Sequence, residues 1–351
     1  MAEQQRTIPV YLLSGFLGSG KTTLLKRWLE KANGQGRKPA VIMNELGDVN
    51  LDGIQLGGQV HMAEMLGGCI CCTVRGDLGY EMMKLIDEHE PDLLLIESTG
   101  AANPLDIIDA VGDASMLKRV ELKQVVTVAD AHHLQAQLEK GKGPTFRLMK
   151  EQLRCATIVL VNKIDLVTEA QADELETAIR DWNPFATLVR TVSAQVDIGL
   201  LEGGGAEQAD RPSVGPERSC GCGDECAHAN EHDRRDGHGH ADPHHTHSHV
   251  MAYTAYFDRP VDSESFEAMM GGLPDDIYRA KGILSFTDTS SRFMFQYAYK
   301  QLDLMKIDPQ GEVPDVAVFI GEHFDKAKLA EAIDRLIERS DSRLQDDSER
   351  Y

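Results

Sequence analysis

Short apolar runs alternate with longer amphipathic stretches between residues 8 and 199. Several of these runs are nearly continuous in Val, Ile and Leu, as a parallel strand buried on both faces requires. They predict strands at 10–13, 39–43, 92–96, 124–128, 157–161 and 187–192, with helices between them that include 23–31, 78–89 and 169–181. The pattern predicts an α/β fold with a doubly wound, mostly parallel sheet, in which ligands bind at the carboxyl ends of the strands.

The pattern changes twice after this sheet. Residues 203–250 are rich in Gly, Pro, Asp, Glu and His and lack the large apolar side chains of a core, which predicts a flexible linker. From 251 onward, strands are expected at 252–257, 282–287, 292–299 and 315–320, and helices at 263–270 and 325–338. Because few of these strands are separated by a crossover helix, we expect a smaller C-terminal α+β domain over 251–338 and a polar tail over 339–351.

The composition narrows the class of protein. The chain has 351 residues, of which 42% are hydrophobic and 26% charged, as in a soluble globular protein. No apolar run reaches the roughly 18 residues that a membrane helix needs. The polar segment 1–7 lacks the apolar core of a signal peptide, so we expect a cytoplasmic protein. The net charge of −21 argues against binding to nucleic acid or to an anionic membrane.

The segment 15–22, GFLGSGKT, fits the phosphate-binding pattern G-x-x-x-x-G-K-[ST] and lies between a predicted strand and a predicted helix. Glycines let successive backbone N–H groups turn towards phosphate oxygens, and the N-terminus of the next helix adds partial positive charge. We expect Lys21 to reach the β- and γ-phosphates and Thr22 to bind Mg²⁺. Residues 1–202 are therefore expected to form a P-loop domain. Its other expected nucleotide contacts in this loop are Gly15, Gly18, Ser19, Gly20 and Thr23.

Two carboxylates that follow strands join the phosphate-loop lysine as candidates for catalysis. Glu45 lies in a loop with Asp48 and Asp52, which suits a nucleotide switch, although an ordinary polar loop has the same composition. Glu97 follows a buried strand, where an acid can hold the hydration shell of Mg²⁺. Gly100, three residues later, can sense the γ-phosphate through its N–H.

The segment 162–165, NKID, follows another buried strand and fits N-K-x-D. Asp165 can accept hydrogen bonds from the ring N1–H and the exocyclic amine of guanine, a donor pair that adenine does not present. We expect Asn162 and Lys163 to hold the base with it, the stem of Lys163 lying along the base plane. Ser193 and Ala194, at the end of the last strand, would complete the pocket. The position of this short motif behind the phosphate loop makes guanine the expected base.

Cys69, Cys71 and Cys72 stand within four residues, directly behind two glycines. Thiolates that converge in this way suit a soft ion such as Zn²⁺ or Cu⁺. Three ligands leave the fourth tetrahedral position open, which suits metal transfer better than a closed structural site. Two alternatives stay open, a redox pair and inert buried thiols.

The linker holds further candidate ligands. Tracts rich in Cys and His bind metals by composition, and imidazole suits Zn, Cu, Ni and Co. The histidines are spaced by Gly, Asp and Pro inside the chain, unlike an appended affinity tag, so we favour a metal-gathering tether. Its auxiliary ligands would be Cys220, Cys222, Cys226, His228, His232, His238, His240, His244, His245, His247 and His249.

These motifs occur in the order GFLGSGKTT, NELG, GCICC, ESTG and NKIDL, at 15–23, 44–47, 68–72, 97–100 and 162–166. In this order they resemble the CobW-type metal-chaperone GTPases, which are relatives of the nickel-insertion GTPases of urease and hydrogenase. Residues 279–282 and 319–321 resemble the second domain of that family. The resemblance implies GTP and Mg²⁺ at the nucleotide motifs, Zn²⁺ or Co²⁺ at the three cysteines, and a client apo-metalloprotein as partner. The cysteines of 220–226 lie outside the family pattern.

The motifs and the resemblance lead to one hypothesis and three rivals. Mg²⁺–GTP would order the loops around Glu45 and Glu97 and bring the three thiolates together, and hydrolysis would release the metal to the client. Hydrolysis is expected to be slow, because the sequence offers no evident arginine finger or water-positioning glutamine. The client, or a second subunit in a GTP-dependent homodimer, would complete the site. The rivals are cobalt or iron insertion into an enzyme or corrinoid, a metal store or sensor, and a signalling GTPase with a structural zinc.

Overall fold

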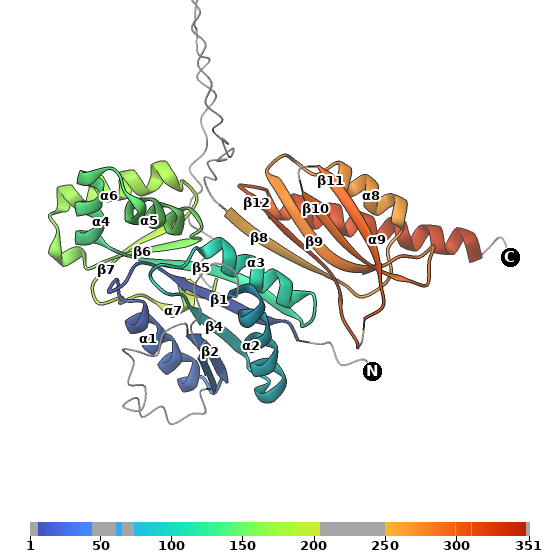
Figure 1. Cartoon of the computed structure of the whole chain (residues 1–351), viewed down its shortest axis with the longest axis horizontal. Helices are drawn as coiled ribbons and strands as arrows, with labels where there is room; N and C mark the ends of the chain where they lie inside the picture. The colour runs from blue at the N-terminus through green and yellow to red at the C-terminus, as the bar shows by residue number, and fades with distance from the viewer. Residues whose placement is uncertain are drawn as a thin grey trace, which may run out of the picture.

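A computed structural model describes residues 6–43, 61–64, 74–203, 250–298, 300–309 and 311–348. Two sheets, each covered by its own helices, lie side by side in this structure (Figure 1). The first sheet is built from the part of the chain before residue 203, and the second from the part after 250.

The first sheet has seven strands in the order β3-β2-β4-β1-β5-β6-β7, and all neighbours are parallel. The predicted doubly wound α/β fold is therefore confirmed. The sequence did not single out β3, a short strand at the edge of the sheet. The bounds are β1 Ile8–Ser14, β2 Pro39–Met43, β3 His61–Glu64, β4 Leu93–Glu97, β5 Val120–Asp130, β6 Ile158–Asn162 and β7 Thr187–Thr191.

Helices cover both faces of this sheet, because alternate side chains of each strand point to opposite sides. In β1, Val10 and Leu12 join a buried cluster with α2 and α3, whereas Tyr11 and Leu13 join a second cluster with α1 and α7. A third cluster lies among α4, α5 and α6. The bounds are α1 Lys21–Gly34, α2 Val74–His89, α3 Pro104–Ser115, α4 Ala131–Lys140, α5 Pro144–Arg154, α6 Glu169–Trp182 and α7 Ile198–Leu201.

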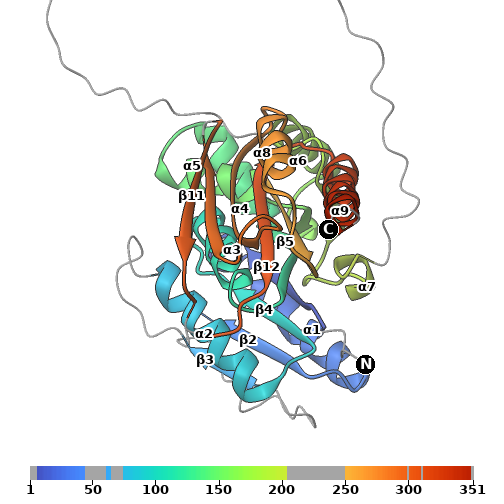
Figure 2. The same cartoon turned by 90° about the vertical axis from the view of Figure 1, so that its right-hand side faces the viewer.

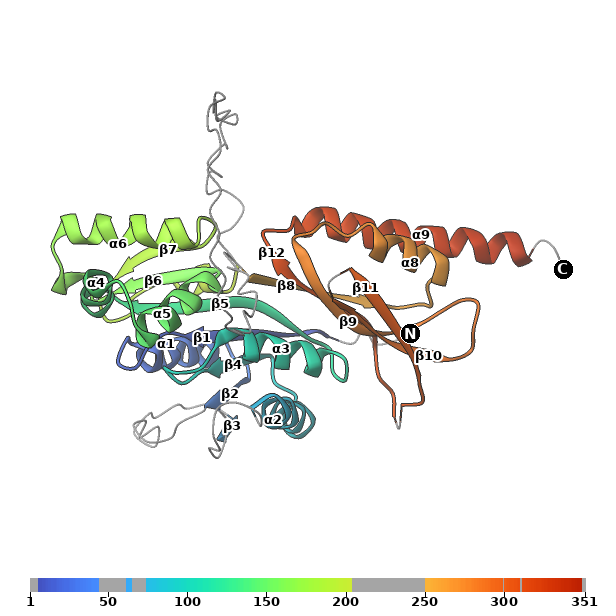
Figure 3. The same ribbon diagram turned by 45° about the horizontal axis from the view of Figure 1, so that its top comes forward.

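The second sheet has five antiparallel strands in the order β11-β10-β9-β12-β8, and α8 and α9 cover one of its faces (Figures 2 and 3). The predicted C-terminal α+β domain is confirmed. Its strand β11 was not predicted, because it is an edge strand whose side chains are mostly exposed and form no apolar run. The bounds are β8 Val250–Phe257, β9 Ile277–Ser285, β10 Arg292–Ala298, β11 Gln301–Ile307, β12 Asp315–Glu322, α8 Ser263–Gly271 and α9 Lys326–Ser348.

Two predicted bounds in this domain were wrong. Strand β9 begins at Ile277 rather than at 282, and α9 continues to Ser348 instead of ending at 338. Part of the segment expected to be a polar tail is therefore helical. Ser340, two residues beyond the predicted end, is fully buried, and its hydroxyl accepts a hydrogen bond from the backbone N–H of Asp262 at 2.8 Å, so the helix still packs on the domain at this point.

Helix α3 lies between the two sheets and contacts both (Figure 3). Arg279 of β9 donates to the Asp109 carboxylate at 2.7 Å, and Lys281 donates to the Asp109 carbonyl at 2.9 Å and pairs with Asp113. Apolar side chains of β12, such as Val318, share a buried cluster with α3. The basic residues of the 279–282 segment thus join the C-terminal sheet to α3.

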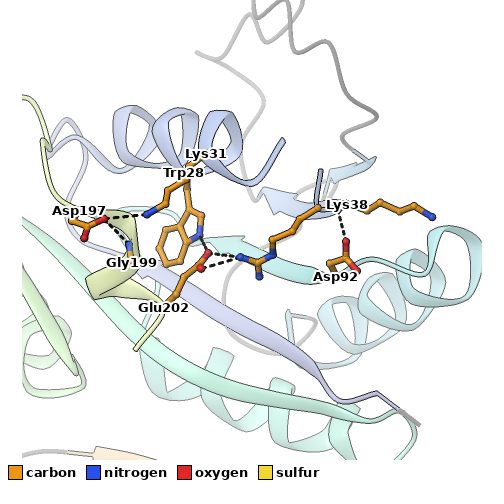
Figure 4. A network of polar contacts seen from close by, with 8 residues as sticks. Trp28, Lys31, Lys38, Asp92, Asp197, Gly199 and Glu202 are labelled. Atoms are coloured by element: carbon orange, nitrogen blue, oxygen red, sulfur yellow. Dashed lines mark hydrogen bonds and ion pairs between the residues drawn. The ribbon is translucent and has the colours of Figure 1, made fainter. Parts of the chain in front are cut away.

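A polar network on the α1 side of the sheet joins the end of the first domain to α1 (Figure 4). Glu202 accepts from the indole Nε1 of Trp28 at 2.9 Å and from the Arg37 guanidinium at 2.8 and 2.9 Å. Lys31 donates to Asp197 at 3.0 Å, so α7 is fastened to α1. These contacts fix the position at which the chain leaves the first domain.

Candidate functional site

The phosphate loop joins β1 to α1 and needs glycine at three positions. Gly15, Gly18 and Gly20 have φ values of 132°, 75° and 113°, in the region that favours glycine. A Cβ on Gly15 would lie 2.2 Å from the carbonyl oxygen of Val128, and one on Gly20 would lie 2.5 Å from Nδ2 of Asn162. Gly20 also provides no side chain to cap α1, which leaves the first N–H groups of the helix for an anion.

Lys21, the first residue of α1, curls back over this loop. Its side chain is almost fully buried, and its Nζ donates to the carbonyl oxygens of Gly15 at 2.9 Å and Phe16 at 3.2 Å. The ammonium group therefore lies at the mouth of the loop, where the sequence predicts phosphate contacts. Thr23 points outward and is exposed.

Oxygen atoms of Thr22 and Glu97 lie together beside the loop. The Thr22 hydroxyl donates to Oε1 of Glu97 at 2.8 Å, and Oε2 of the same carboxylate is buried with no hydrogen-bond partner among the described residues. Burial raises the pKa of Glu97, and the Thr22 hydroxyl and the Lys21 charge offset only part of this effect. A hydroxyl next to a half-satisfied carboxylate is a donor set that fits Mg²⁺.

Three more buried hydroxyls near this pair also lack a partner among the described residues. Unpaired polar atoms of this kind cost free energy unless a ligand or water satisfies them. Their concentration on the phosphate side of the site fits an anionic ligand with bound water. They are the hydroxyls of Ser14, Ser19 and Thr99.

Gly100 brings the turn after β4 against the phosphate loop. A Cβ at this position would lie 2.5 Å from the backbone nitrogen of Leu17, so glycine is required for the close approach. The Gly100 carbonyl accepts from the side-chain amide of Gln152 at 3.1 Å. The sequence did not indicate Gln152, because a single glutamine inside an amphipathic helix belongs to no motif.

The base side of the site is organised around Asn162, at the end of β6. Its side-chain amide donates to the Ser19 carbonyl at 2.7 Å, which ties the base motif to the phosphate loop. Its Oδ1 accepts from the Ala194 N–H at 2.8 Å and from the Thr191 hydroxyl at 3.1 Å. The structure therefore brings together the two sequence motifs and the Ser193–Ala194 turn.

Lys163, Ser193 and Ala194 have positive φ values of 58°, 51° and 52°, which turn both loops sharply after their strands. The Lys163 ammonium donates to Oδ2 of Asp130 at 2.6 Å. Asp165 lies in a short 3₁₀ turn, Ile164–Leu166, and is exposed. The guanine contacts of these residues stay a prediction.

Asp130, the last residue of β5 and the N-cap of α4, was missed by the sequence reasoning, which ended this strand at 128. Its carboxylate caps α4 by accepting from the His133 N–H at 2.9 Å, besides pairing with Lys163. Burial raises the pKa of Asp130, but the hydrogen bonds from Lys163 and His133 outweigh it, and the pKa is lowered overall. The His133 ring lies edge-on to Phe16 of the phosphate loop, with ring centroids 5.1 Å apart.

Several predicted site residues lie outside the described part of the chain. They are Glu45, the triad of Cys69, Cys71 and Cys72, and all the linker ligands. Of the seven cysteines, Cys155 alone falls within the described residues; it is fully buried, and burial raises the pKa of its thiol. In the part of the chain that the structure covers, no three His, Cys, Asp or Glu side chains are grouped to hold a metal.

The strands place the starts of these segments, however. Glu97 of β4 is in register with Met43 of β2, and Met43 is in register with Glu64 of β3. The chain passes from Met43 into the segment with Glu45, and from Glu64 into the segment with the three cysteines. Both segments therefore begin at the carboxyl edge of the sheet, one and two strands away from the Thr22–Glu97 pair.

The fold, the phosphate loop and the base motif define the class: a P-loop nucleotide-binding protein of the GTPase type. Residues 9–190 match the family model CobW/HypB/UreG, nucleotide-binding domain, and residues 250–337 match the cobalamin synthesis protein cobW C-terminal domain. The chain belongs to the CobW/HypB/UreG family of P-loop GTPases.

Curated relatives match to different extents. The zinc chaperone CobW of Sinorhizobium sp is 27% identical over 85% of this chain and 87% of its own length. The zinc-regulated GTPase metalloprotein activator 1 of Dictyostelium discoideum is 35% identical over 54% of this chain, and the match spans 47% of that protein. The zinc chaperone YjiA of Escherichia coli is 34% identical over 55% of this chain and 60% of its own length.

Among solved structures, the Zn(II)-bound YjiA GTPase from E. coli is similar at 24% identity and a TM-score of 0.47, over 95% of this chain and 99% of that chain. Within the described residues, no helix combines the length and the apolar character that crossing a membrane demands.

Proposed function

We propose that this protein is a GTP-hydrolysing metallochaperone, which binds a transition metal in a nucleotide-dependent way and delivers it to a client protein. Zinc is the metal that we favour, because thiolates suit it and because the relatives named above are zinc chaperones or zinc-regulated. The observation that carries the proposal is the register of Glu97, Met43 and Glu64. It supports a single edge at which both nucleotide and cysteines act.

The residues divide the work between nucleotide and metal. Lys21 and the N–H groups at the start of α1 bind the β- and γ-phosphates, and Asn162, Lys163 and Asp165 hold guanine. Thr22 and Glu97 hold Mg²⁺, which neutralises charge that develops on the phosphates during transfer. The cysteine triad at 69–72 takes the metal cargo, and the Cys/His tether at 220–249 gathers it.

Any coupling between the nucleotide site and the metal site must be reciprocal. If GTP raises the affinity for zinc, zinc must raise the affinity for GTP by the same factor. Glu45 and the turn after Glu97 would change with the γ-phosphate, and hydrolysis would then weaken the metal site. Basal hydrolysis is slow in this scheme, and a client or a second copy of the chain in a GTP-dependent homodimer completes the catalytic site.

The test is a competitive zinc titration of the full-length protein with Mg²⁺–GTPγS and with Mg²⁺–GDP. The linker ligands are replaced (Cys→Ser, His→Gln) so that only the triad is measured. We expect zinc to bind about tenfold or more tightly in the GTPγS state. The same protein with Cys69, Cys71 and Cys72 changed to Ser is the control and should lose this difference. Equal affinities in the two states would rule out a nucleotide-gated carrier.

Measurements on the same protein samples distinguish this proposal from two alternative functions. A metal store or sensor predicts negligible GTP turnover even with zinc and a client present. A cobalt or iron insertion chaperone predicts that the GTPγS-dependent gain in affinity is larger for Co²⁺ or Fe²⁺ than for Zn²⁺. The titration is therefore repeated with each metal.

A further inference from the structure

We propose that Gln152, on α5, is a positioning residue for GTP hydrolysis, which fixes the Gly100 turn in the conformation that reads the γ-phosphate. The inference deepens the proposed function and rests on its assignment of the Gly100 N–H to the γ-phosphate. No sequence motif includes this glutamine, and its partner lies 52 residues away in the chain.

Gln152 is built into the core beneath the turn. Its side chain is 1% exposed, and its Nε2 donates to the carbonyl oxygens of Gly100 at 3.1 Å and Ala102 at 3.5 Å. Its own backbone carbonyl accepts from the buried Thr127 hydroxyl of β5 at 2.8 Å. Thr127 is in register with Ser14, the last residue of β1 before the phosphate loop. The glutamine therefore links the turn to β5, which pairs with β1, the strand that leads into the phosphate loop.

The turn is also held by backbone hydrogen bonds: inside it, the Ala102 N–H donates to the Thr99 carbonyl at 3.1 Å. At the start, the Ser98 N–H and hydroxyl both donate to the Leu13 carbonyl, at 3.0 and 3.1 Å. At the finish, the Asn103 side chain caps α3 by accepting from the Leu105 N–H at 3.1 Å. Between these ends, Gln152 is the side chain that satisfies the carbonyl groups of the described turn.

A fixed Gly100 carbonyl restricts the orientation of the residue and hence of its N–H. Gly100 also touches the phosphate loop so closely that its backbone cannot shift without moving Leu17. Loss of the Gln152 donor would leave a buried carbonyl unpaired, and the turn would relax to satisfy it. GDP has no γ-phosphate, so this relaxation should weaken GTP binding and leave GDP binding unchanged.

The experiment compares affinities for Mg²⁺–GTPγS and Mg²⁺–GDP in full-length Gln152→Met, which keeps the length of the side chain but cannot donate. We expect the ratio of GTPγS to GDP affinity to fall about tenfold, with GDP affinity within about twofold of the unmodified protein. Single-turnover GTP hydrolysis should slow by a similar factor. A purely structural glutamine would instead lower stability and affect both nucleotides alike.

Asn183 provides the matched control. It is another fully buried amide, the residue that follows α6, and its Nδ2 donates to the carbonyls of Leu153 and Ala156, both at 2.8 Å, around the end of α5. Its hydrogen bonds lie away from the Gly100 turn. Asn183→Ala should therefore lower stability without changing the nucleotide ratio. If Gln152→Met does not fold, Gln152→Leu, which also has no donor, takes its place, and the same fall in ratio is expected.

Gly100→Ala separates failure of this inference from failure of the proposed function. If Gly100→Ala lowers the GTPγS-to-GDP ratio but neither Gln152 variant does, the turn reads the γ-phosphate without Gln152 and the inference is wrong. If none of the three variants changes the ratio, the turn does not read the γ-phosphate, and both the inference and its basis are wrong.

Discussion

The base side and the phosphate side of the nucleotide site differ in how far the protein satisfies its own polar groups. On the base side, the Asn162 amide binds three partners inside the protein, and Asp130 pairs with Lys163. On the phosphate side, four buried oxygens have no partner among the described residues, those of Ser14, Ser19, Glu97 and Thr99.

This difference suggests two ways of building a binding site. The base pocket is organised by folding itself, so its residues also stabilise the protein without nucleotide. The phosphate side holds its polar atoms unpaired at a cost to stability, which phosphate, Mg²⁺ and water offset on binding. Substitutions on the base side should therefore mainly lower the stability of the nucleotide-free protein, whereas substitutions on the phosphate side should mainly weaken nucleotide binding.

Asn162→Ala should lower the free energy of unfolding of the nucleotide-free protein by about 3 kcal/mol, because it strands the Ser19 carbonyl and the Ala194 N–H in the interior. Urea denaturation without nucleotide measures this loss. Asp165→Asn, in the same motif but exposed, is the control and should change base preference with little change in stability. A loss below about 1 kcal/mol in Asn162→Ala would show that the base side is not organised by folding.

Lys21→Met, on the phosphate side, should weaken nucleotide binding far more than it lowers stability. We expect GTP and GDP affinities to fall about 100-fold, since a buried cation at the phosphates is removed. The stability of the nucleotide-free protein should fall by about 1 kcal/mol, less than in Asn162→Ala, because the losses include hydrogen bonds to loop carbonyls and the charge that partly offsets the burial of Glu97. Isothermal titration and urea denaturation on one sample give both values. A large loss of stability without nucleotide would contradict the comparison.

Glu97→Gln should stabilise the protein in buffer without nucleotide and Mg²⁺, by about 1 kcal/mol at pH 7, because it removes a buried charge. Burial raises the folded-state pKa of Glu97 above its unfolded value of 4.5, so the folded protein binds more protons between the two values. Stability of the unmodified protein should therefore fall as pH rises through that window and stay lower above it.

Denaturation of both proteins between pH 4 and pH 8 measures this effect. The gain in Glu97→Gln should vanish below about pH 4.5, where the carboxyl is neutral in both states. In the presence of Mg²⁺–GTP the sign should reverse, since the variant loses the carboxylate that holds the hydration shell of Mg²⁺. A variant less stable than the unmodified protein at pH 7 without ligand would argue against an unsatisfied phosphate side.

Asp130→Asn should have the smallest effect. The Lys163–Asp130 pair is half-buried, with side chains 35% and 13% exposed, so we expect about 0.5–1 kcal/mol of stability to be lost. The asparagine can still cap α4, which limits the damage. GDP should bind about threefold more weakly, because Lys163 is less well positioned along the base. An unchanged GDP affinity would show that Asp130 serves only to cap the helix.

The predictable parts of the site are those defined by local sequence. The loop at 15–22 and the motif at 162–165 each bring a residue type and a spacing that the chemistry requires, so they can be found without a structure. Gln152 and Asp130 cannot be found in this way, because their partners lie 52 and 33 residues away and neither belongs to a pattern. Their roles arise from tertiary contacts.

In the fold, too, the elements that were predicted are those with a local sequence signal. Buried parallel strands such as β4 and β6 are short, nearly continuous apolar runs, and they were predicted almost to the residue. Strand β11 depends on hydrogen bonds to β10 rather than on burial, so its sequence carries little signal. Helix α3 was also not predicted; nine of its 12 residues are buried, and its polar residues Asp109 and Asp113 pair with basic residues of the C-terminal sheet.

Helix α3 gives the molecule a mechanical property. It starts four residues after Gly100 and spans 12 residues, or about 18 Å. A tilt of about 5° at its first turn would therefore displace its far end by about 1.5 Å. Two ion pairs, Arg279–Asp109 and Lys281–Asp113, join this helix to β9. The C-terminal sheet would therefore move with the helix. A small rotation of α3 at the nucleotide site would thus be transmitted to the second domain and enlarged along the length of the helix.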